Sequence, residues 1–79
     1  MAVSSTNRIR TAALAESIAT ELARAARHLA EQGQAATAEV LLQQARHNRV
    51  LALRLRAEAG AEQYLRTIGA AGSDGAVLS

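Results

Sequence analysis

The sequence predicts an all-α fold: an antiparallel two-helix hairpin with a longer second helix, which completes a helical bundle by oligomerisation. Three observations predict it. Apolar residues recur at steps of three and four along two long segments, 8–32 and 35–68. Gly33 separates these segments within a polar stretch that is only long enough for a tight reversal, which makes the helices antiparallel. The chain contains no proline, so little interrupts either segment.

The first helix is predicted over residues 8–32, after a flexible segment at 1–7 whose serine, threonine or asparagine side chains can cap it. It is amphipathic, with charged and hydroxyl side chains on one side and a single apolar face on the other. The apolar face consists of Leu14, Ile18, Leu22, Ala25 and Leu29, broadened by Ala15, Ala19, Ala26 and Ala30.

The second helix, predicted over 35–68, carries two apolar stripes. The first has the spacing that keeps one face turned to a partner helix and contains Ala38, Leu41, Ala45, Asn48, Ala52, Leu55 and Ala59. The second lies roughly 90–180° further round the helix and contains Leu42, Val50, Leu53, Ala57, Tyr64 and Ile68. A helix that is apolar over so much of its circumference is usually buried on more than one side. Asn48 either fixes the register of the first stripe or is satisfied locally or by solvent.

A turn near residue 33 places Arg8 beside roughly Ala59, because both helices rise equally per residue. Residues beyond about Gly60 then overhang the first helix, so Tyr64, Leu65 and Ile68 have no facing helix in their own chain unless the N-terminal segment folds back across them. The second helix is predicted to end at 68, and the glycine-rich residues 69–79 are predicted to form a flexible tail.

The segment 22–45 resembles a single unit of the tetratricopeptide repeat family, in which two antiparallel helices pair through alternating small and large residues. The matching residues are Leu22, Ala25, Ala26, Leu29, Gly33, Ala38, Leu42 and Ala45. The segment departs from the family pattern in three ways: it lacks the aromatics of the first helix, lacks the proline near Val50, and is one unit where stable arrays need about three. The resemblance implies a protein-binding scaffold and no enzyme.

Length and composition favour association with another chain. The 79 residues allow one domain, and alanine is the commonest residue while Tyr64 is the only aromatic, so a hairpin of this chain buries a thin seam. Cysteine is absent, and the formal net charge of +2 argues against a general nucleic-acid coat. Because no apolar run is long enough to span a membrane and the N-terminus lacks the apolar block of a signal peptide, we expect a cytoplasmic protein of a bacterium or phage.

The sequence shows no catalytic, cofactor-binding or metal-binding motif. His28 and His47 lie on polar arcs without the spacing that sets ligands on one helical face, so we interpret both as solvated surface side chains. The carboxylates are scattered, and no acid–base pair stands out. We therefore predict no enzyme activity, no cofactor, no metal and no small-molecule substrate.

These patterns predict a non-enzymatic interaction or assembly protein that self-associates or docks on a larger complex. The predicted interface consists of Leu42, Val50, Leu53, Ala57, Tyr64, Leu65 and Ile68. One alternative is a small dimeric regulator that binds nucleic acid through Arg46, Arg49 and Arg56, although these arginines can equally pair with Glu16, Glu21 or Glu31 of another chain. A further alternative is an accessory subunit of an enzyme complex, bound by the same apolar stripe.

Overall fold

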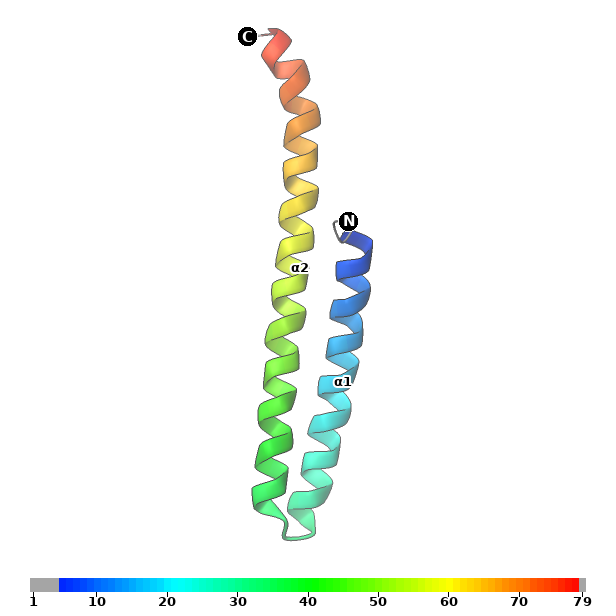
Figure 1. Ribbon diagram of the computed structural model, residues 1–79, viewed down its shortest axis with the longest axis vertical. Coiled ribbons are helices and arrows are strands. Elements are labelled where there is room, and N and C mark those ends of the chain that lie inside the picture. The colour runs from blue at the N-terminus through cyan, green and yellow to red at the C-terminus, as the bar shows by residue number, and fades with distance from the viewer. Residues whose placement is uncertain (1–4, 79) are drawn as a thin grey trace.

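The computed structural model confirms the predicted antiparallel hairpin of two helices (Figure 1). Helix α1 spans Ser5–Glu31 and helix α2 spans Ala35–Leu78. The molecule is a rod of 67 × 21 × 16 Å, and the C-terminal part of α2 extends well past the start of α1. The structure describes residues 5–78, with their side chains up to Gly69.

The turn between the helices is a glycine-terminated helix end, as predicted. Gly33 has a φ of 82°, a left-handed conformation that glycine adopts without steric cost. The amide of Gly33 donates to the carbonyl of Ala30 at 3.0 Å, and the amide of Gln34 donates to the carbonyl of Leu29 at 2.9 Å. This pair of bonds is the Schellman arrangement, which satisfies the last carbonyls of α1. The carbonyl of Gln34 then accepts from the amide of Ala38 and starts α2.

The buried seam between the helices is built from alanine. In each helix the buried residues include a set that recurs every seventh position: Ser5, Ala12, Ala19 and Ala26 in α1, and Ala38, Ala45, Ala52 and Ala59 in α2. Ala12 and Ala15 pack against Ala52, with Leu51 and Leu55 at the edge of this cluster. The set in α2 belongs to the predicted first stripe, so the prediction that this stripe faces the partner helix is confirmed.

The face that α1 turns to α2 differs from the predicted centre of its apolar arc. Ala12, Ala15 and Ala19 are buried, whereas Leu14 is 61% exposed and Ile18 is 42% exposed. The reason is size: methyl side chains on both helices allow the backbones to approach closely, and a leucine on the line of contact would hold them apart. The large residues therefore flank the seam or lie outside it.

The pairing of the two helices matches the prediction, and their ends differ from it. Arg8 lies beside Glu58 and Glu62, which confirms the expected position next to Ala59. Helix α1 starts at Ser5, three residues before the predicted start, and residues 1–4 of the predicted flexible segment lie outside the described residues.

The C-terminal end of α2 also differs from the prediction. The helix continues to Leu78, whereas a helix end at 68 and a tail over 69–79 were expected. Glycine within a helix costs only about 1 kcal/mol relative to alanine, and no proline blocks the helix after Gly69. Residue 79 lies outside the described residues.

The alanine seam predicts that two neighbouring substitutions differ in their effect on the stability of the hairpin. Ala12 is fully buried and Ala13 is exposed on the same turn of α1. Ala12→Leu should destabilise the hairpin by about 1–3 kcal/mol, because the larger side chain forces the helices apart. Ala13→Leu, the matched control, should change stability by less than about 0.5 kcal/mol. Urea unfolding followed by circular dichroism at one protein concentration measures both; equal effects would contradict an alanine-limited seam.

Candidate interaction surface

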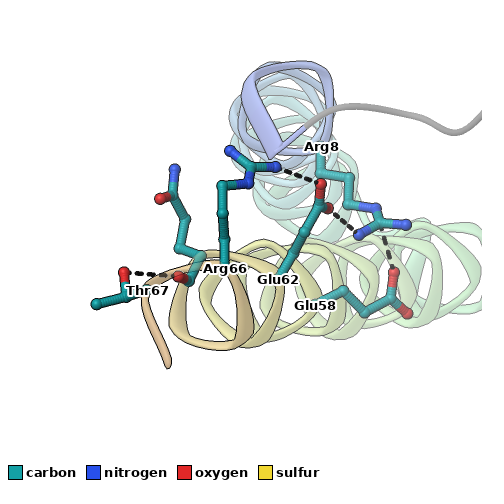
Figure 2. A network of polar contacts seen from close by, with 6 residues as sticks. Arg8, Glu58, Glu62, Arg66 and Thr67 are labelled. Carbon is teal, nitrogen blue, oxygen red and sulfur yellow. Dashed lines mark hydrogen bonds and ion pairs between the residues drawn. The ribbon is translucent and has the colours of Figure 1, made fainter. Parts of the chain in front are cut away.

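A charged network ends the alanine seam where α1 begins (Figure 2). The Nη1 of Arg8 donates to Oε2 of Glu62 at 2.6 Å, and its Nε lies 3.9 Å from Oε2 of Glu58. The Nη2 of Arg66 donates to the other Glu62 oxygen at 3.0 Å. Glu62 and Arg66 occupy the side of α2 that carried Ala52 and Ala59, so beyond residue 60 this side is polar. The overhang therefore presents charges where an extension of α1 would lie.

The apolar residues of the same part of α2 lie on the opposite side, facing away from α1. At 100° per residue they lie between about 100° and 180° from Ala52 and Ala59, and Leu53 is among those nearest α1. We call this surface the outer stripe and define it as Val50, Leu53, Ala57, Ala61, Tyr64, Leu65 and Ile68. Its large members are between 44% and 66% exposed, and the most exposed are Leu53, Tyr64 and Leu65. All the predicted interface residues except Leu42 thus belong to the outer stripe.

Leu42 is placed differently from the rest of the predicted interface. It is half-buried on the flank of α2 nearer the seam, so it supports the hairpin more than it extends the outer stripe. Two open hollows lie on the same flank. One is lined by Ile9, Arg56, Ala59, Gly60 and Gln63, and the other by Glu16, Thr20, Arg49 and Leu53.

Two of the three arginines proposed to contact phosphate are paired within the chain. The Nη2 of Arg56 donates to Oε2 of Glu16 at 2.9 Å, and the Nη1 of Arg56 donates to Oε1 of Glu16. The two residues therefore form a bidentate ion pair across the helices. The Nη1 of Arg46 lies 3.8 Å from Oε1 of Glu39 on its own helix. Within the part of the chain that the structure describes, Arg49 makes no ion pair. The sequence suggested that Arg56 pairs with a glutamate of another chain. In the structure Arg56 pairs with Glu16 of its own chain.

The Glu16–Arg56 pair changes the proton affinity of both groups. The hydrogen bond from Arg56, aided by its positive charge, lowers the pKa of Glu16 below its ordinary value of 4.5. The same bond raises the pKa of Arg56. Both side chains remain roughly half exposed, at 47% and 41%, so water screens the attraction. The pair fixes the two helices in register more than it stabilises them.

The polar residues singled out in the sequence are satisfied locally. The Nδ2 of Asn48 donates to the carbonyl of Gln44 at 2.9 Å, one turn back in α2. His28 lies 3.2 Å from the amide nitrogen of Gln32 and is exposed, as is His47, which confirms their interpretation as surface side chains. Among the residues that the structure describes, no three His, Asp or Glu side chains gather as metal ligands would. No described helix is long and apolar enough to cross a membrane.

Comparisons with family models, curated proteins and solved structures found no match. The resemblance of residues 22–45 to a tetratricopeptide unit therefore stays an interpretation of the sequence.

Sequence reasoning missed a second group of exposed apolar residues. Leu14 and Ile18 project from α1, and a hollow beside them is lined by Ser17, Ile18, Glu21 and Leu22. The helical pattern placed Leu14 and Ile18 on the same arc as Leu22 and gave no sign that α1 would turn its alanines inward. The recurrence of alanine at every seventh residue in both helices is the signal that identifies the true contact line.

The Glu16–Arg56 pair predicts a pH dependence of stability. Because the folded-state pKa of Glu16 is lowered, the pair stabilises the hairpin above about pH 4.5 and this contribution is lost as the pH falls through the lowered value. Glu16→Gln should therefore lower the melting temperature at pH 7 and have no effect near pH 2. Glu31→Gln is the control, since Glu31 makes no ion pair among the described residues. Thermal melting followed by circular dichroism tests this; a Glu16→Gln effect equal at both pH values would rule the pair out.

Proposed function

We propose that this protein is a non-enzymatic assembly or interaction module, a helical hairpin that associates with protein through the outer stripe. The observation that carries the proposal is the distribution of side-chain size. The fully buried positions hold alanine, and the large apolar residues Leu53, Tyr64, Leu65 and Ile68 are exposed. A hairpin that used its own large residues for its own core would show the reverse.

The energetics of this distribution favour a partner. A large apolar side chain contributes about 1.5–3 kcal/mol when it passes from water to a fully buried site. The described hairpin gains little of this from Val50, Leu53, Tyr64, Leu65 and Ile68, because each is still at least 44% exposed. Contiguous exposed apolar surface on a small protein usually marks an interaction site. The outer stripe has this character along the outward side of α2.

The shape of the molecule supports the same function. Helix α2 has 44 residues and α1 has 27, so among the described residues the end of α2 has no neighbouring helix (Figure 1). The overhang carries Tyr64, Leu65 and Ile68 on its outward side and charges on the other. A protein partner that covers the outward side extends the structure without burying Glu62 or Arg66.

Binding of nucleic acid through the arginine face is the less favoured function. Arg56 is held by Glu16, and Arg46 lies near Glu39, so a phosphate would have to compete with a carboxylate at two of the three predicted contacts. The single aromatic side chain, Tyr64, lies on the outer stripe and not among these arginines.

Replacement of Leu53 by glutamate tests the proposed surface. Leu53 is 65% exposed, so Leu53→Glu should leave the hairpin folded but weaken association on the order of a hundredfold, because a charge replaces an apolar contact. Thr37→Glu is the matched control: it places the same charge on an exposed position in the first turn of α2, outside the outer stripe. Light scattering after size exclusion gives the mass, and circular dichroism checks the helix content. A Leu53→Glu variant with the assembled mass of the wild type would contradict the proposal.

A further inference from the structure

The sizes of the side chains along the outer stripe are roughly symmetrical about the position of Ala59. Its middle is small, with Ala57 and Ala61, and its two ends are large. Ala57 and Ala61 lie two residues before and after Ala59, and Val50 and Ile68 lie nine residues before and after it. Leu53 lies six residues before Ala59, Tyr64 lies five after it and Leu65 six.

The matching residues also point in matching directions. At 100° per residue, Val50 and Ile68 project from the same side of α2, and Leu53 and Tyr64 differ by about 20°. Two identical helices that pack antiparallel about a twofold axis bring together residues that lie on one flank at equal distances from that axis. The pattern about Ala59 fulfils this condition.

We infer that the partner of the outer stripe is a second copy of this chain, with the two α2 helices antiparallel about a twofold axis level with Ala59. Val50 of each copy then packs on Ile68 of the other, Leu53 on Tyr64, and Ala57 on Ala61. The inference deepens the proposed function and rests on it. A different protein as the partner would not require a pattern that is symmetrical about its own centre.

The centre of the stripe is suited to close approach. With Ala57 and Ala61 facing each other, the second seam repeats the alanine packing that already joins α1 to α2.

The geometry also accounts for the length of α2. About Ala59, residue 40 of one copy is level with residue 78 of the other, so the two long helices overlap over about 58 Å. Each overhang then lies along the part of the partner's α2 that is braced by the partner's α1. The hairpins form a four-helix layer with their turns at opposite ends.

The buried area places this dimer in the range of a reversible complex. A fully exposed side chain of this size carries about 60–120 Å² of apolar surface. The five large residues of the stripe, each 44–66% exposed, supply roughly 500 Å² in the two copies together. A specific interface buries about 1,000 Å² or more, so the remaining area has to come from the alanines and the rest of the overlap.

Cysteine cross-linking tests the arrangement, since the natural chain contains no cysteine. Ala57→Cys and Ala61→Cys are prepared separately, one with a mass tag, and each is oxidised alone and after mixing. The proposed axis brings position 57 of one copy within disulfide reach of position 61 of the other. Positions 57 and 57 are offset by about 6 Å along the helices. The mixed sample should therefore form covalent dimer roughly tenfold faster than either variant alone. Val50→Cys mixed with Ile68→Cys should behave in the same way.

The outcomes separate the inference from the proposed function. Preferential cross-linking of unlike variants supports the antiparallel axis at Ala59. Preferential cross-linking of like variants overturns it in favour of a parallel pair. Dimers in light scattering without cross-linking in any mixture overturn it as well, and leave association at another surface such as Leu14 and Ile18. A chain that stays monomeric overturns both the inference and the proposed function.

Discussion

Close approach of two alanine-lined helices is the constraint on which this structure depends. Because Ala12, Ala19, Ala45 and Ala52 recur at seven-residue spacing, the backbones pack tightly along one line. Each methyl group removes little area from water, so the seam is narrow and its hydrophobic contribution is small for its length. A narrow seam cannot fully cover leucine or tyrosine side chains. The packing that joins α1 to α2 therefore also leaves large apolar residues of both helices exposed, among them Leu14, Leu53 and Tyr64.

The two sides of α2 have separate roles. The inner side holds the hairpin together as far as Arg8, where the network with Glu58 and Glu62 ends the seam in charges. The outer side stays apolar as far as Ile68, past the point where α1 begins. Glu16 and Arg56 form a second charged contact between the helices, and such exposed contacts set register more than they add stability. Register matters here because it determines which part of α2 overhangs.

Much of the architecture could be predicted from the sequence. The periodicity of 35–68, the glycine at position 33 and equal helix rise gave the hairpin, its turn and the place of Arg8 beside Ala59. The orientation of α1 could not be predicted in this way, because periodicity treats alanine and leucine as equally apolar, whereas their difference in volume determined that Ala12 faces inward and Leu14 outward. The end of α2 at Leu78 was missed because Gly69 was weighed as a helix stop when it only lowers helix stability. The bond between Arg56 and Glu16 depends on that same orientation.

The claim most open to test is that the large apolar surface of this hairpin is covered by another protein chain in solution. Sedimentation equilibrium of the wild-type protein over a wide concentration range measures this directly. We expect a reversible rise from the mass of one 8.3 kDa chain towards an assembled mass of twice that value as the concentration increases. A fully helical protein that sediments as a single 8.3 kDa chain at every concentration would contradict it.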